Sequence, residues 1–473
     1  MAEIDAVVVG SGPNGLAAAI TLARAGLSVT VLEANDQIGG GMRSGEATLP
    51  GFVHDHCAAI YPLGVSSPLF RTLPLDKHGL EWVQPDAALA HPLDDGTAVL
   101  LERSIELTVR QFNTTDVLPY RALVQPLTEV WERLCRTLLA PIAPLRHPIE
   151  LTRFGWNGLR SGTAVARKFR GPRVRALFAG MAGHAMLPLD ATGGGAIALV
   201  LAVAAHSVNW PFPRGGAQNL ANALAGYLRS CGGQIVTGHR VRSLDDVPPC
   251  RAVLFDLSPR PLLEIVGDRF PERYRKLLTQ FRYSCMGAFK VDWALSSPVP
   301  WRSPDVSRAA TVHLGGTMEE IQATESNVWK GGINERPYMI LAQHTLFDPS
   351  RAPKGKHTLW GYCHVPRGTE SDMLPRMEAQ IERFAPGFRD CILARKVTTP
   401  IGFEADNPNI VGGDITGGRQ DLWQTFIRPT LNHYVTPLKN VFICSASTPP
   451  GGGVHGMCGF AAANVALRRV FRK

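Results

Sequence analysis

Residues 4–15 read IDAVVVGSGPNG, and this stretch decides the fold. The β-branched run Ile4–Val9 is typical of a strand that is buried on both faces of a parallel sheet. Gly10 allows a tight turn after the strand, Gly12 lets backbone N–H groups approach a phosphate, and Gly15 lets the next helix pack closely on the strand. The stretch therefore predicts a loop that holds the diphosphate of a dinucleotide.

The residues after this loop predict a helix. Asn14–Ala25 (NGLAAAITLARA) is rich in alanine and leucine, and Gly26 is its expected stop signal. The amino end of a helix carries unpaired N–H groups and partial positive charge. We therefore expect Pro13 and Asn14 to lie beside the bound anion.

A second predicted strand, Ser28–Leu32 (SVTVL), ends in Glu33. The position is about 20 residues past the glycines, where a carboxylate accepts the ribose hydroxyls of a dinucleotide. An acid there would repel a 2′-phosphate. Strand, glycines, helix, strand and acid follow each other without insertion, which favours dinucleotide binding over an incidental glycine-rich turn.

Composition indicates an ordinary globular protein of two or three domains. The chain has 473 residues, of which 45% are hydrophobic and 19% charged. The amino terminus enters the first strand directly, so we expect no signal peptide and a cytoplasmic protein. The longest uncharged apolar run, residues 193–205, is shorter than the roughly 20 residues of a spanning helix and predicts a buried helix.

The charge pattern indicates no nucleic-acid partner. The net charge of +9 is spread along the chain, although Arg468, Arg469, Arg472 and Lys473 cluster at its end. We interpret this cluster as a solvated basic helix end, with peripheral membrane contact as the alternative.

The nine cysteines are scattered and include no CxxC pair. They predict neither a disulfide framework nor a zinc site, and they offer no redox dithiol beside a flavin. His54 and His56 lie two residues apart without further ligands nearby, so we expect them to be structural and predict no metal.

A glycine cluster follows soon after Glu33, and with it the sequence resembles a known group of families. Gly39, Gly40 and Gly41 imply a backbone that passes close to a ligand. The dinucleotide unit followed by this cluster resembles the FAD-binding amino terminus of amine oxidases, protoporphyrinogen oxidases and phytoene desaturases. Many members have arginine directly after the glycine pair. Here Gly41 takes that place, and Arg43 is the candidate for the contact.

The carboxy-terminal segment 440–459 (NVFICSASTPPGGGVHGMCG) is similar to the flavin motif of phytoene-desaturase-like proteins. A strand leads into a glycine loop, and a helix over residues 454–471 is expected to point its positive end at the flavin. The resemblance implies flavin contacts at Gly453, Val454 and His455. Many relatives have Gly-Asp where this chain has Ser445-Ala446, which leaves the ribityl contact to the backbone or to Ser447.

The middle of the chain predicts a discontinuous organisation. Residues 232–236 and 239–241 resemble the family segment whose backbone meets adenine, with Val241 as the candidate. We predict an α/β protein in which residues 1–65, 210–290 and 400–473 form a Rossmann-like FAD-binding domain with a mainly parallel sheet. Residues 66–209, mostly helical, and 291–399, with an antiparallel sheet, would form an inserted α+β substrate domain. The aromatic residues that we expect to line the substrate cavity of this domain are Trp293, Trp301, Trp360 and Tyr362.

Only one complete dinucleotide unit is present, so the expected cofactor is FAD. The resemblance implies an oxidoreductase that dehydrogenates an apolar or amphipathic small molecule by hydride transfer to flavin, with oxygen or a quinone as candidate electron acceptors. His455 is the candidate catalytic residue, because it is the only titratable side chain inside a flavin motif; its alternative is simple packing. The alternative functions are amine oxidation and a regulatory FAD protein with little turnover.

Overall fold

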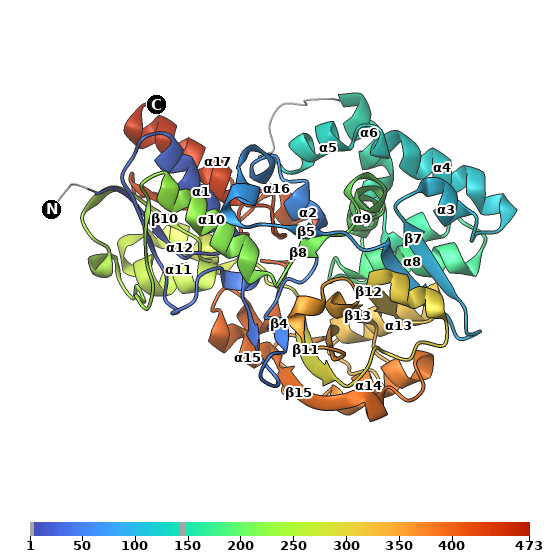
Figure 1. Cartoon of the computed structure of the whole chain (residues 1–473). Coiled ribbons are helices and arrows are strands. Elements are labelled where there is room, and N and C mark those ends of the chain that lie inside the picture. The colour runs from blue at the N-terminus through green and yellow to red at the C-terminus, as the bar shows by residue number, and fades with distance from the viewer. Residues whose placement is uncertain (1–3, 142–147) are drawn as a thin grey trace.

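The computed structural model describes residues 4–141 and 148–473 and contains two large sheets (Figure 1). The first sheet has five parallel strands in the order β16-β10-β1-β2-β9. Its strands are β1 (Ile4–Val9), β2 (Val29–Leu32), β9 (Gln234–Val236), β10 (Cys250–Phe255) and β16 (Val441–Ile443). The strands predicted for the dinucleotide unit are confirmed, and the chain returns to this sheet twice from distant parts of the sequence.

Helices cover both faces of the parallel sheet, as the apolar character of β1 predicts. Ala6 and Val8 point into a core shared with α1, α10 and α17, whereas Val7 and Val9 point into a second core beneath α11 and α12. The helices are α1 (Pro13–Arg24), α10 (Gln218–Ser230), α11 (Pro259–Val266), α12 (Glu272–Thr279) and α17 (Met457–Ala466). All five lie in the left-hand lobe of Figure 1.

The carboxy-terminal helix starts later than the sequence predicts. We expected it to begin at Val454, but α17 begins at Met457 and continues as a π-helical turn over Leu467–Phe471. The reason is local, because Gly453 and Gly456 have φ angles of +120° and +69°, which a right-handed helix cannot include. Gly459 then lets α17 approach the backbone of α1 at Asn14 so closely that a Cβ there would overlap the Asn14 carbonyl oxygen.

The second sheet has seven strands in the order β15-β11-β14-β13-β12-β6-β7. All neighbours are antiparallel except β12 and β6. The strands are β6 (Ala87–Pro92), β7 (Ala98–Glu102), β11 (Met286–Leu295), β12 (Ala309–Leu314), β13 (Met339–Ala342), β14 (His357–Pro366) and β15 (Ile392–Thr398). The antiparallel strands expected between residues 291 and 399 are present, so the fold is α/β with a Rossmann-like parallel sheet and a second, mixed sheet.

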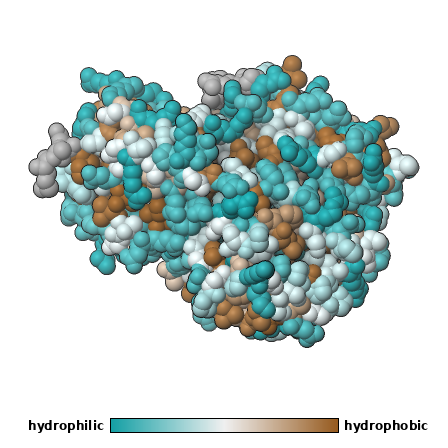
Figure 2. Space-filling model, in the orientation of Figure 1, coloured by the Kyte–Doolittle hydropathy of each residue, from teal (hydrophilic) through white to brown (hydrophobic). Residues whose placement is uncertain are grey.

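A helical region packs beside the mixed sheet. Its main helices are α4 (Thr114–Thr128), α5 (Trp131–Leu138), α8 (Pro172–Gly183) and α9 (Gly194–Val208). The buried helix expected over residues 193–205 is α9, which contacts α4 and α8. Within residues 4–141 and 148–473 no helix is both long and apolar enough to cross a membrane. On the face shown in Figure 2, apolar residues are scattered among polar ones.

The predicted domain division remains a prediction. One of its boundaries, after residue 290, falls inside β11, which runs without a break through the mixed sheet. An ion pair also joins the predicted domains: buried Arg351 contacts Asp55, and within its own predicted domain it contacts Asp348. These side chains are fully buried, so the predicted domains share a buried polar junction.

Candidate functional site

A cavity of about 610 Å³ reaches from the parallel sheet to the mixed sheet. Its lining includes the loops after β1, β2 and β10, the loop before α17, and side chains of β12, β13 and β14. Ligands of open α/β sheets bind at the carboxyl ends of the strands, and sites for small molecules typically have volumes of about 300–1,000 Å³. The cavity therefore has the position and size of a ligand site.

The glycine loop forms one wall of the cavity. Gly10, Gly12, Pro13 and Asn14 line it, and Gly10 has a φ of +101°, which explains the need for glycine there. Gly15 is not on the wall. It lies behind the loop, where it allows close packing of α1 against the loop backbone, because a Cβ at Gly15 would overlap the carbonyl oxygen of Gly10.

Glu33 lines the cavity at the end of β2 and is almost completely buried. One carboxylate oxygen accepts hydrogen bonds from the Ser11 backbone N–H at 2.9 Å and the Ser11 hydroxyl at 2.5 Å. The other accepts the Asn35 N–H at 2.9 Å. The acid therefore fixes the glycine loop against the end of β2, and its expected contact with ribose remains a prediction.

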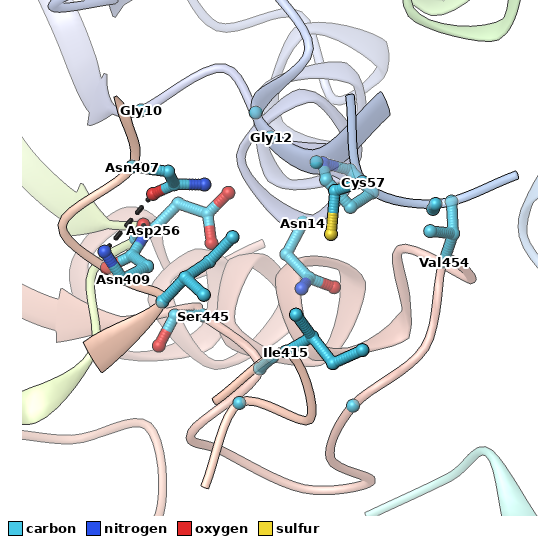
Figure 3. Close-up of a pocket in the computed structure, with 18 of the residues that line it drawn as sticks. Gly10, Gly12, Asn14, Cys57, Asp256, Asn407, Asn409, Ile415, Ser445 and Val454 are labelled. Carbon is cyan, nitrogen blue, oxygen red and sulfur yellow. Dashed lines mark hydrogen bonds between the residues drawn. The ribbon is translucent and has the colours of Figure 1, made fainter. Parts of the chain in front are cut away.

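Asp256, directly after β10, is a cavity residue that our sequence analysis did not select. Its carboxylate accepts the Gly15 N–H at 2.8 Å, and a Cβ at Gly12 would lie only 2.7 Å from its Oδ2 atom. In Figure 3 the Asp256 and Asn14 side chains extend into the space beside the loop of Gly10 and Gly12. Burial raises the Asp256 pKa to about 7, against the opposing effect of the Gly15 N–H.

The glycines after β2 form the next part of the wall. Gly40 and Gly41 line the cavity together with Cys57. Arg43 does not reach the cavity: its Nε donates to the Gly40 carbonyl oxygen at 2.9 Å, and its guanidinium pairs with Asp406. Arg43 therefore holds the backbone of the cavity wall instead of presenting a charge to the ligand.

The carboxy-terminal loop supplies a third wall, with Ser445, Ser447, Gly453 and Val454 among its residues. The Ser445 hydroxyl donates to the Leu257 carbonyl oxygen at 2.8 Å and lies 2.7 Å from the Ser447 hydroxyl. The two serines thus tie the loop to the end of β10. Val241, the expected adenine contact, lines the same cavity beyond Glu33.

His455 is next to this wall but does not line it, in contrast to our expectation of a residue facing the flavin. Its Nδ1 accepts the Met457 N–H at 3.0 Å, and its ring is 1% exposed. Burial lowers the His455 pKa to about 4, so the ring is neutral at pH 7. These contacts give His455 a packing and capping role at the start of α17.

The mixed sheet and α9 form the apolar end of the cavity. Its side chains include Leu201, Trp210, Ile340, Ala342, Trp360 and Tyr362. Of the four candidate aromatics, Trp360 and Tyr362 reach the cavity. Trp293 and Trp301 belong to a separate core and donate their indole N–H groups to Glu378 and Gln343. The sequence did not distinguish these pairs, because the sheet face of Trp293 on β11 and the position of Trp301 in the loop after it depend on how the strands pair.

Lys290 is a second residue that the sequence analysis did not select. It is 2% exposed on β11, pairs with the buried Asp292, and its Nζ lies 5.9 Å from the centre of the Trp360 ring. The register of β11 and β14 pairs Lys290 with Tyr362 and Asp292 with Trp360, so the charge pair lies on the same sheet face as these rings, beside the aromatic part of the cavity wall. In the sequence, the signal was a lysine between two apolar residues, Phe289 and Val291.

The cavity fits an extended dinucleotide such as FAD. The amino end of the 12-residue helix α1 opens on it, and the wall there consists of glycine backbone that a Cβ would displace. The Asn14 Oδ1 atom is buried beside the cavity with no hydrogen-bond partner in the described part of the chain. An acceptor and N–H donors close together are suited to a ligand that carries both phosphates and hydroxyl groups.

Comparisons with known proteins agree with this reading of the cavity. Residues 8–73 match the family described as NAD(P)-binding Rossmann-like domain. The chain is 26% identical to mouse (Mus musculus) pyridine nucleotide-disulfide oxidoreductase domain-containing protein 2, over 98% of this chain and 94% of the relative. It is 28% identical to a phytoene dehydrogenase of Streptomyces griseus, over 95% of this chain and 92% of that protein.

A solved structure of wild-type putrescine oxidase bound to putrescine shares the fold. Its TM-score is 0.61 at 17% identity, and the match covers 99% of both chains. The matched domain and the relatives that align over nearly the full length indicate an FAD-dependent oxidoreductase similar to phytoene desaturases, and the fold is shared with putrescine oxidase.

Proposed function

We propose that this protein uses FAD to dehydrogenate an apolar or amphipathic small molecule. One observation carries the proposal: one cavity connects two regions. The first, which we call the cradle, consists of the glycine loops of the parallel sheet and includes Gly10, Gly12, Gly40 and Gly453. The second, which we call the wall, is the apolar end on the mixed sheet and α9 and includes Leu201, Ile340, Trp360 and Tyr362. A dinucleotide held at Gly12 and Val454 would thus share one enclosed space with a substrate lying against Ile340 and Trp360. FAD bound there would accept a hydride from the substrate.

The protein's own residues would position the substrate and exclude water from it. Leu201, Ile340 and Ala342 present hydrocarbon to the substrate, and they are buried or half-buried against the rest of the fold. Burying an apolar substrate there is favourable by about 25 cal/mol per Å² of apolar surface. The substrate's apolar body, rather than an ion pair, would therefore supply most of the binding energy.

The residues at the apolar end include few groups for proton transfer. Among the described residues that line it, His184 and Tyr362 are the titratable ones. Burial lowers the pKa of His184 to about 3 and raises that of Tyr362, which keeps both neutral at pH 7. This environment suits a reaction in which hydride leaves one carbon of the substrate and a proton then leaves the neighbouring carbon, so that a double bond forms between the two. A proton next to a cationic carbon is acidic enough to be lost to water without a strong base.

Amine oxidation is the second candidate, and one observation favours it. Trp360 and Tyr362 lie edge to face with ring centroids 5.3 Å apart, an arrangement that can bind a cation. Two features oppose it: no described lining residue of the apolar end is acidic, and Nζ of Lys290 lies 5.9 Å from the centre of the Trp360 ring on the same sheet face. We therefore rank amine oxidation below oxidation of a neutral substrate.

The test is to purify the protein, identify any released dinucleotide, and mix the FAD-loaded protein without oxygen with limonene, carvone, phytoene or putrescine. Loss of the oxidised flavin absorbance with limonene, carvone or phytoene supports the proposal. Loss with putrescine alone supports amine oxidation, and reduction by none of them supports a regulatory FAD protein. Finding NAD, or failure to bind FAD, contradicts the proposal. Reoxidation with oxygen or a quinone then identifies the class of electron acceptor.

A further inference from the structure

A histidine lies among the mainly apolar side chains at this end of the cavity. His184 follows helix α8, lines the cavity beside Trp210, and is half-buried. Its ring meets the Trp210 ring at 78°, with centroids 6.0 Å apart, so the indole limits how the imidazole can turn. The described residues offer no hydrogen-bond partner for its Nδ1, which makes this atom available to a ligand.

A second histidine fixes the other nitrogen of this ring. His184 Nε2 lies 2.8 Å from Nε2 of His313, which is fully buried on β12. Burial lowers the pKa of both rings, so each is neutral at pH 7. In a neutral pair, one Nε2 must carry the hydrogen and the other must accept it.

The surroundings of His313 determine which nitrogen donates. Its Nδ1 is buried without a partner and packs against Gly180, where even an added Cβ would lie 2.5 Å from it. A buried N–H without a partner is less readily tolerated than a buried acceptor without one. The hydrogen of His313 is therefore on Nε2, and it is donated to His184 Nε2.

This arrangement leaves the hydrogen of His184 on Nδ1, where it is available to the cavity. We propose that His184 is a specificity residue that donates a hydrogen bond to an oxygen acceptor of the substrate, with His313 as the residue that sets its tautomer. The substrate class is then a largely apolar molecule that carries a carbonyl, ether or hydroxyl oxygen, and a pure hydrocarbon is disfavoured. This inference rests on the proposed function, because it assumes that the apolar end holds the substrate.

Limonene and carvone test the inference, because they share a carbon skeleton and differ in one carbonyl oxygen. Both are titrated into the FAD-loaded protein, and binding is followed through the flavin absorbance spectrum. We expect carvone to bind about tenfold more tightly than limonene, the usual scale for one buried hydrogen bond. Equal affinity, tighter binding of limonene, or binding of neither ligand would overturn the inference.

Variants separate hydrogen bonding from packing. His184→Phe should abolish the preference for carvone while limonene binding changes less than about threefold, and His184→Gln, which retains an N–H donor, should restore part of it. His313→Leu should weaken the preference for carvone, because it removes the donor that sets the His184 tautomer. His313 does not line the cavity, so this variant leaves the cavity-lining side chains unchanged. An unchanged preference in His184→Phe would contradict the role of the imidazole.

The tautomers can be measured directly without any ligand. Nitrogen-15 shifts of labelled histidines, assigned with the same variants, should show hydrogen on Nδ1 of His184 and on Nε2 of His313. The opposite tautomers would overturn the inference even if the protein binds FAD. Failure to bind FAD would instead contradict the proposed function, so the two failures are distinguishable.

Discussion

The dinucleotide cradle and the apolar wall border the same cavity but are built from different parts of the polypeptide. Loops after the parallel strands form the cradle, and they expose mainly backbone and short side chains such as Gly12 and Ser447. Faces of the mixed sheet and α9 form the wall, and they expose large side chains such as Ile340 and Trp360. The cradle is thus specified by backbone conformation, and the wall by the packing of side chains.

Arg351 should give the largest effect, because it joins Asp55, two residues before the cavity-lining Cys57, to the segment between the wall strands β13 and β14. It donates to Asp55 at 2.7 Å and to the Pro213 carbonyl oxygen at 2.8 Å, and it contacts Asp348. Arg351→Met would leave two buried carboxylates without their cation, so we expect the free energy of unfolding to fall by about 3–5 kcal/mol. Urea denaturation would measure this loss.

The matched control for Arg351 is the exposed pair of Arg376 and Glu335. Arg376→Met should leave the unfolding midpoint unchanged, because exposed ion pairs contribute little. Equal effects of the two substitutions would mean that the junction between the cradle and the wall is not held by buried charge.

Gly15→Ala should damage the cradle and spare the wall. Its Cβ would overlap the Gly10 carbonyl oxygen, so the loop must shift. We expect FAD to bind about a hundredfold more weakly, which corresponds to the 1–3 kcal/mol typical of overpacking. Equilibrium dialysis with FAD measures the change. Gly155→Ala is the control, since its Cβ meets nothing within 4 Å; equal losses in both variants would contradict the prediction.

Asp256 makes the cradle sensitive to pH. The folded protein raises its pKa from 3.8 to about 7, so between these values the folded state binds more protons than the unfolded chain. Stability should therefore fall as the pH rises through this interval and level off above about pH 7. Asp256→Asn keeps an acceptor for the Gly15 N–H and should remove this component of the pH dependence, which unfolding curves from pH 4 to 8 would show.

The same carboxylate should affect FAD. Above pH 7 it is ionised and would repel a diphosphate in the cradle, so Asp256→Asn should bind FAD on the order of tenfold more tightly than the wild type at pH 8.5. The exposed Asp245→Asn serves as the control. A wild type that binds FAD equally well at pH 6 and pH 8.5 would show that Asp256 does not face the diphosphate.

His455 should give the smallest effect. His455→Asn can retain an acceptor for the Met457 N–H, and we expect kcat to change by less than about threefold because the ring is outside the cavity wall. His455→Ala loses this acceptor and should lower the free energy of unfolding by about 1–3 kcal/mol. A fall in kcat of two orders of magnitude in His455→Asn would restore the catalytic role that the sequence suggested.

The difference between the cradle and the wall also explains what could be predicted. Gly10, Gly12, Glu33 and Val454 were selected from the sequence, and the structure places all four on the cavity wall. Their signals are local, because a positive φ or a strand that ends in an acid depends on a few consecutive residues. Cofactor contacts of these residues remain predictions, as does the role of Val241.

Asp256 and His184 escaped selection because their positions depend on contacts across the fold. Asp256 meets Gly15, 241 residues away in sequence, and His184 meets His313, 129 residues away. A lone acid after a strand and a lone histidine after a helix are common in buried structural roles. Only their tertiary neighbours indicate a ligand.

The sequence by itself determined the parallel sheet, the glycine cradle and the FAD-dependent oxidoreductase superfamily, because backbone turns and strand burial are encoded in short stretches such as residues 4–15. The tertiary structure decided which aromatic residues reach the cavity, where Arg43 and His455 point, and how His184 is oriented. These features depend on side chains from distant segments that meet only when both sheets pack together. We therefore expect the wall to determine the nature of the substrate, and the cradle that of the cofactor.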